Sequence, residues 1–101
     1  MEFIILTFVA HQEGEYFVSE CRELGTSSFG SDVDEAFSNL LDATKVYLYT
    51  LEDLRESHRV LEQKGVRVYE YEPADLEVSR AKFPAGSRIQ PTIVNLEHAH
   101  A

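Results

Sequence analysis

The spacing of apolar residues changes partway along this chain of 101 residues, and that change restricts its fold. Residues 3–22 read as two strand-forming runs rich in Phe, Ile, Leu and Val, separated by the turn signal Glu13-Gly14. Residues 26–29 form a short third run. Residues 33–51 then place apolar side chains three or four positions apart, as one face of a helix does. We therefore predict an α+β fold of β-β-β-α-β order, in which an antiparallel sheet packs on one long helix.

The first strand, residues 2–12, is apolar on both of its faces. One face carries Ile4, Leu6, Phe8 and Ala10, and the other carries Phe3, Ile5, Thr7 and Val9. A two-residue turn at Glu13-Gly14 sets Val9 opposite Val18 and Leu6 opposite Cys21. Because one helix covers only one face, we predict that the second face joins subunits of a homodimer or higher oligomer. The residues expected in that contact are Phe3, Ile5, Val9 and Val18.

The helix has a clear start signal and a less definite end. Asp32 is the expected N-cap, and Glu35 three residues later completes an Asp version of the capping box. The apolar positions predict a helix of about 17 residues, roughly 25 Å long, which Thr50 ends or breaks. Helical composition resumes over residues 51–64 as an added second segment, and Gly65 is its expected C-cap.

The remainder of the chain mixes strand and loop signals. Residues 66–71 alternate as a strand does, and Pro73 ends that run. We assign residues 1–73 to the α+β domain and residues 74–101 to a C-terminal extension that packs on the same domain or extends it. Within the extension, residues 92–96 could add a last strand.

The charge of the chain is uneven. The formal net charge of −9 argues against nucleic acid as a direct ligand, since a phosphate-binding surface must be basic. Residues 1–42 hold nine acidic residues against the single base Arg22, a net charge of −8, whereas the remaining residues have a net charge of −1. An acidic half attracts a basic protein, although it also serves solubility. The carboxylates expected to meet such a partner are Glu13, Glu15, Glu20 and Glu23.

Two groups of side chains, one acidic cluster and one histidine pair, are of a kind that can bind metal ions. Asp32, Asp34 and Glu35 could hold magnesium for a nuclease, but three carboxylates at a helix start also serve as cap and dipole partners. His98 and His100 would share a strand face, yet no third ligand is evident near them. We therefore expect neither a metal nor another cofactor.

The single cysteine bears on both chemistry and compartment. In the expected hairpin, Cys21 and His11 lie about 17 Å apart along the strands, too far for a nucleophile–base pair. One cysteine cannot form an internal disulfide, which suits a cytoplasmic protein. The apolar opening run lacks the features of a signal peptide and is too short to span a bilayer, so no membrane contact is expected.

The order of signals between Cys21 and Ala43 resembles the HicB-like family of small bacterial and archaeal proteins. The matching residues are Glu23-Leu24, Gly30, Glu35-Ala36, Asn39-Leu40 and Ala43. The resemblance implies a degraded ribonuclease H-like shape without a working active site, and self-association. In antitoxin members of the family, it also implies binding that covers the RNA-cutting surface of a toxin.

The sequence departs from that family pattern in three places. Ser31-Asp32 stands where Asp-Thr is usual, residues 51–64 are inserted, and a recognisable DNA-binding segment is lacking. It is most similar to the stand-alone members. We predict a non-catalytic, HicB-type antitoxin that binds and masks a small basic RNA-cleaving toxin. The alternatives are a stand-alone homo-oligomer without a toxin, or a small metal-dependent hydrolase or nuclease.

Overall fold

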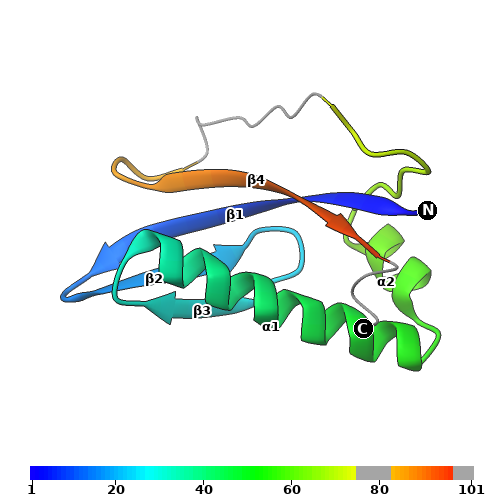
Figure 1. The fold of residues 1–101 in the computed structure, drawn as a ribbon, viewed down its shortest axis with the longest axis horizontal. Coiled ribbons are helices and arrows are strands. Elements are labelled where there is room, and N and C mark those ends of the chain that lie inside the picture. Colours follow the sequence, from blue (N-terminus) through cyan, green and yellow to red (C-terminus); the bar gives the residue numbers. More distant parts are fainter. Residues whose placement is uncertain (75–82, 97–101) are drawn as a thin grey trace.

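The computed structural model describes residues 1–74 and 83–96, which form a four-stranded antiparallel sheet and two helices (Figure 1). The elements are β1 (Phe3–Glu13), β2 (Tyr16–Cys21), β3 (Ser27–Gly30), α1 (Val33–Asp53), α2 (Ser57–Gln63) and β4 (Arg88–Asn95). Their order across the sheet is β3-β2-β1-β4, so β2 and β4 flank β1. The predicted α+β class and β-β-β-α-β order are confirmed.

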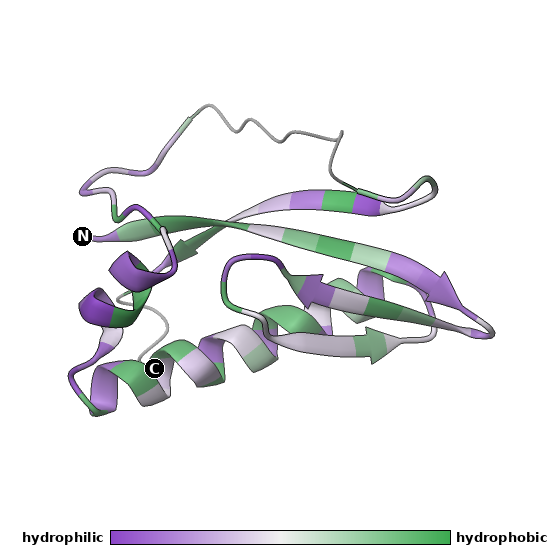
Figure 2. Cartoon of the chain, turned by 180° about the vertical axis from the view of Figure 1, so that it is seen from behind, coloured by the Kyte–Doolittle hydropathy of each residue, from purple (hydrophilic) through white to green (hydrophobic). Residues whose placement is uncertain are grey.

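The long helix α1 packs along one face of the sheet and buries the main core (Figure 1). The alternate β1 residues Ile4, Leu6, Phe8 and Ala10 are at most 1% exposed. They meet α1 residues such as Leu40 and Leu48, and Leu61 of α2 joins the same cluster. Figure 2 shows β1 as hydrophobic along most of its length and hydrophilic at its C-terminal end, which leads into the hairpin turn. The face of β1 that carries Ile4 is therefore the one that the helix covers.

The β1–β2 hairpin turns at Gly14 and Glu15, one residue later than the sequence indicated. The register pairs Glu13 with Tyr16, His11 with Val18, and Phe8 with Cys21, in place of the expected Val9–Val18 and Leu6–Cys21 pairs. Gly14 has a φ of 60°, the positive value that a type II′ turn requires at the first of its two central positions. The correction shifts the pairing by two residues, so each side chain keeps its predicted face.

The junction between β3 and α1 is fixed by a cap and a close contact. Asp32 accepts a hydrogen bond from the Glu35 backbone N–H (2.7 Å), and the Glu35 carboxylate accepts one from the Ser31 N–H (3.0 Å), so the predicted capping role is confirmed. A Cβ on Gly30 would lie 2.5 Å from the backbone nitrogen of Ala36. Glycine is therefore required where β3 meets the first turn of α1.

The prediction that α1 ends near Thr50 is wrong, since α1 has 21 residues and ends at Asp53. The Thr50 hydroxyl donates to the Val46 carbonyl at 2.9 Å, which satisfies it within the helix. The break falls instead at Arg55, whose φ is 58°. Around it, the Arg55 N–H donates to the Glu52 carbonyl and the next N–H donates to the Leu51 carbonyl, the two hydrogen bonds of a Schellman motif.

The second helix and the chain after it differ from the prediction in extent. Gly65, with a φ of 72°, ends α2 through the same pair of hydrogen bonds, so the predicted C-cap is confirmed. The expected strand over residues 66–71 is reduced to one bridge between Tyr69 and Phe3. The other side of β1 is taken by β4, which begins at Arg88, earlier than the predicted residues 92–96. Only the short stretch of β1 beyond the end of β2 is left for Tyr69 to pair with.

Candidate functional site

The sheet face opposite α1 is the candidate functional site, and we call it the outer face. Ser19 marks the inner face, because its hydroxyl donates to the Ala36 carbonyl in α1 at 2.7 Å. The strand register then places the odd-numbered residues of β1, β3 and β4 and the even-numbered residues of β2 on the outer face. Its apolar members are Phe3, Ile5, Val9, Tyr16, Val18, Phe29, Ile89, Pro91 and Ile93.

The four residues that were predicted to form an oligomer contact all lie on this outer face. Phe3 and Val9 are each only 8% exposed within the single chain, whereas Ile5 and Val18 are partly buried. Ile5 pairs with Ile93 across β1 and β4, which brings a second partly buried isoleucine beside it. The sequence did not indicate this contribution from β4.

The chain itself covers part of the outer face near Val9. The turn that precedes β4 lies beside this residue, and a hollow of about 180 Å³ remains between them. The hollow is lined by Val9, His11, Glu20, Arg22, Phe83, Pro84 and Ser87. The Arg22 guanidinium carbon lies 5.4 Å from the centre of the Phe83 ring, a cation–π distance that holds this turn against β2.

At the hairpin end of the outer face, two aromatic rings are open to solvent. Tyr16 is 58% exposed and Phe29 is 64% exposed, and their ring centroids lie 6.1 Å apart in an edge-to-face arrangement. Val18 lies opposite Phe29 on β3 and opposite His11 on β1. We call Tyr16, Val18 and Phe29 the aromatic tip.

Three of the four carboxylates that were predicted to bind a partner surround the aromatic tip. Glu13 pairs with Tyr16 across the hairpin, Glu15 precedes it in the turn, and Glu20 follows two positions beyond Val18. All three are exposed. Glu13 lies 3.6 Å from the His11 ring nitrogen, and Glu20 lies 3.4 Å from the Arg22 guanidinium. The acidic rim of the tip thus consists of Glu13, Glu15 and Glu20.

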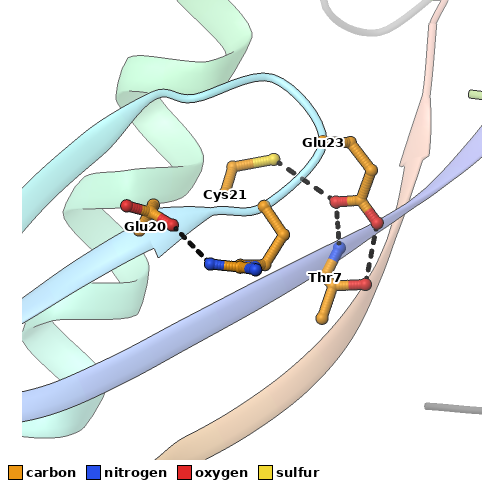
Figure 3. Close-up of polar contacts among 5 residues, drawn as sticks. Thr7, Glu20, Cys21 and Glu23 are labelled. Atoms are coloured by element: carbon orange, nitrogen blue, oxygen red, sulfur yellow. Dashed lines mark hydrogen bonds and ion pairs between the residues drawn. The ribbon is translucent and has the colours of Figure 1, made fainter. Parts of the chain in front are cut away.

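The fourth carboxylate, Glu23, is used inside the fold (Figure 3). Its two oxygens accept hydrogen bonds from the backbone N–H and the hydroxyl of Thr7, each at 2.8 Å. β2 ends at Cys21, and the Arg22 backbone N–H still donates to the Thr7 carbonyl at 3.0 Å, but the Thr7 N–H donates to the Glu23 carboxylate and not to a strand carbonyl. Glu23 takes the place of that missing strand partner. The Glu-Leu-Gly sequence after β2 marks the turn, but not this contact.

Cys21 is a packed residue on the inner face. Burial raises the pKa of its thiol to about 11, with a smaller contribution from the nearby Glu23 carboxylate. Its Sγ lies 3.8 Å from a Glu23 oxygen, and its side chain is fully buried in the core cluster. His11 projects from the outer face, so the two side chains lie on opposite sides of the sheet.

The acidic group at the start of α1 is occupied by capping. Asp32 and Glu35 both accept backbone hydrogen bonds there. Within residues 1–74 and 83–96, no group of three His, Cys, Asp or Glu side chains could hold a metal ion. His98 and His100 lie outside the described residues.

Both outer edges of the sheet are poorly suited to strand addition. On β3, the Asn39 side chain donates to the Phe29 carbonyl at 2.9 Å, and this carbonyl points away from β2. On β4, Pro91 lies opposite Thr7. The Thr7 carbonyl accepts a hydrogen bond from the Arg22 backbone N–H, so it points toward β2. The nitrogen of Pro91 therefore faces the free edge and has no hydrogen to donate there.

Comparisons with protein-family models, with curated proteins and with solved structures found no match to this chain. Neither α1 nor α2 is both long and apolar enough to cross a lipid bilayer, among the residues that the structure describes.

Proposed function

We propose that this chain is a non-catalytic protein-binding module whose working surface is the outer face of its sheet. Its relation to the HicB-type antitoxins, proposed from the Cys21–Ala43 signals, makes the partner a small basic RNA-cleaving protein. The module would mask that partner by occupying its RNA-binding surface.

One observation carries the proposal: α1 covers the inner face alone, while the outer face combines exposed aromatic rings with a rim of carboxylates. Buried aromatic anchors inside a charged rim are the usual composition of a protein–protein contact. The edges carry Asn39 and Pro91 at positions that oppose strand addition. A partner is therefore expected to dock on the face.

The non-catalytic part of the proposal is supported by the roles of the reactive side chains. Asp32 and Glu35 cap α1, Glu23 replaces a strand partner of Thr7, and Cys21 is buried in the core. Each of these groups thus has a structural function that accounts for its presence. Catalysis would need such groups to converge on an accessible point.

The experiment is co-expression with any small basic protein that is encoded beside this chain, followed by co-purification and an RNA-cleavage assay. We expect a stable complex in which cleavage is suppressed. Association should slow with salt, because the Debye length falls from about 10 Å at 0.1 M to about 3 Å at 1 M. Neutralising Glu13, Glu15 and Glu20 to Gln should lower the association rate more than it raises the dissociation rate. Full RNA cleavage in the presence of excess module would contradict the proposal.

A second candidate is a stand-alone homo-oligomer, favoured by the Ile5–Ile93 pair. Both isoleucines remain partly exposed in the single chain, away from the acidic hairpin. A second copy of the same face could cover them by isologous contact. Self-association through these isoleucines would also be compatible with toxin binding, since the two contacts use different parts of the outer face.

A further inference from the structure

We infer that the aromatic tip, Tyr16, Val18 and Phe29, is the anchoring point for an arginine-bearing basic segment of a partner protein. The inference deepens the proposed function and rests on it for the identity of the partner. It locates the docking point at one end of the outer face and specifies the side chain that the tip prefers.

Exposure distinguishes the tip from the rest of the outer face. Tyr16 and Phe29 are 58% and 64% exposed, whereas Phe3 and Val9 on the same face are 8% exposed. The two rings touch each other and belong to adjacent strands, so they form one continuous surface on a rigid sheet. Exposed, preorganised aromatic rings are typical anchors for a partner side chain.

Charge determines which side chain fits. Glu13 lies across the hairpin from Tyr16 and Glu15 lies next to Tyr16 in the chain, so two exposed acidic residues flank Tyr16. The Glu20 carboxylate forms an ion pair with Arg22 at 3.4 Å, and the Glu23 carboxylate accepts two hydrogen bonds from Thr7. The available negative charge is therefore concentrated at the hairpin end. This setting favours a cation that can lie on a ring and pair with a carboxylate.

Arginine meets both demands better than lysine does. Its planar guanidinium stacks on an aromatic face while its N–H groups pair with a carboxylate in a bidentate geometry. A lysine ammonium is more strongly hydrated and offers a point charge only. A second copy of this chain is a poor occupant of the tip, because it would bring Glu13 and Glu15 against the same two carboxylates.

The test is a titration of the ¹⁵N-labelled full chain with a capped pentapeptide that carries one arginine on each side of a central leucine. We expect saturable shifts at the amides of Tyr16, Val18 and Phe29. Replacing both arginines with lysine should weaken binding roughly threefold, and replacing them with neutral citrulline should abolish it. Amide shifts of equal size at acidic residues elsewhere on the chain, or equal binding of the lysine peptide, would overturn the inference.

Matched variants separate the tip from general acidity. Tyr16→Ser with Phe29→Ser should weaken the arginine peptide roughly fivefold, while Val46→Ser with Leu54→Ser, which removes side chains 66% and 65% exposed on and beside α1, should not. Glu13→Gln with Glu15→Gln provides a second test that leaves the rings in place. Unchanged peptide binding by both tip variants would refute the inference.

The same variants distinguish this inference from the proposed function. A partner complex that survives Tyr16→Ser with Phe29→Ser at full affinity would refute the tip while leaving the protein-binding module intact. Arginine-selective peptide binding at the tip, without a complex with any basic protein encoded beside this chain, would support the tip and contradict the antitoxin proposal.

Discussion

The carboxylate of Glu23 accepts the backbone N–H and the hydroxyl of Thr7 where β2 has turned away from β1. Composition placed Glu23 with the acidic residues that attract a partner, and its position in the fold assigns it a structural contact instead. A sequence identifies the charge of a residue, but the contact depends on where a neighbouring strand ends. That end point is a property of the whole sheet.

Replacing Glu23 with Ala should lower the free energy of unfolding by about 1–3 kcal/mol, because the partly buried Thr7 N–H loses its acceptor. Glu23→Gln retains one acceptor oxygen and should cost less. Urea denaturation measures both. The exposed Glu13 serves as control, and Glu13→Ala should change stability by less than about 0.5 kcal/mol. Equal effects of Glu23→Ala and Glu13→Ala would contradict this role.

Arg55 occupies the left-handed backbone conformation between α1 and α2, with a φ of 58°. Residues with a Cβ are disfavoured there, whereas glycine adopts it freely. Arg55→Gly should therefore stabilise the protein by roughly 0.5–1 kcal/mol. Arg55→Ala removes the same charge without relieving the backbone, and so provides the control in thermal unfolding. A loss of stability in the glycine variant would show that the Arg55 side chain matters more than its φ.

At the scale of elements, local signals were predictable and competition between segments was not. Asp32 and Gly65 act within one turn of their helices, so the sequence located both caps correctly. Residues 66–71 have a strand pattern, yet β4 pairs with residues 3–10 of β1 on the side away from β2. Which of two strand-like segments pairs with β1 depends on the relative free energies of the two pairings. The alternation pattern of one segment gives no information about that difference.

The second helix is tied to the start of β1 by an ion pair. His58 lies 3.0 Å from a Glu2 oxygen, and this hydrogen bond with the Glu2 charge raises the pKa of His58 above its ordinary 6.5. A raised pKa means that the folded protein holds the proton more tightly than the unfolded chain. The resulting stability is fully present below pH 6.5 and is lost as pH rises through the folded pKa.

His58→Gln should therefore lower the urea midpoint at about pH 5.5 and have a smaller effect at about pH 8. Glu2→Gln should reproduce the same pH dependence from the other side of the pair. A midpoint difference that is constant across this range would contradict the link between α2 and β1.

Pro91 interrupts the donors on the free edge of β4. Pro91→Thr should restore a backbone N–H there and extend the edge that another strand can pair with. We expect increased self-association with concentration, measured by light scattering. Thr92→Val keeps the proline and alters the neighbouring residue, so it should leave the molecular mass unchanged. Identical scattering from the Pro91→Thr variant and the native chain would show that the edge is closed by something other than the proline.

At the scale of the whole molecule, one sheet carries two different faces. The sequence predicted this division correctly from the alternation in β1, since a shift of two residues in the hairpin leaves the faces unchanged. It overestimated how much of the second face is left open. Phe3 is bridged by Tyr69, and Val9 is sheltered by the turn at Phe83 and Pro84. Both contacts come from segments far along the chain, which no local pattern relates to β1.

The remaining open area near Ile5 and Ile93 leads to the last prediction, a homodimer or higher oligomer at micromolar concentration. Both residues are partly buried and paired across β1 and β4, in the stretch of the outer face between the Tyr69 bridge and the turn at Phe83. Ile5→Ser with Ile93→Ser should shift the sedimenting mass toward the 11.5 kDa monomer, because two apolar anchors leave the contact. Tyr16→Ser with Phe29→Ser, at the acidic hairpin end, should leave the oligomer intact since like charges keep a second copy away from the tip. A native chain that sediments as a monomer at these concentrations would mean that its own later segments complete the cover of the outer face.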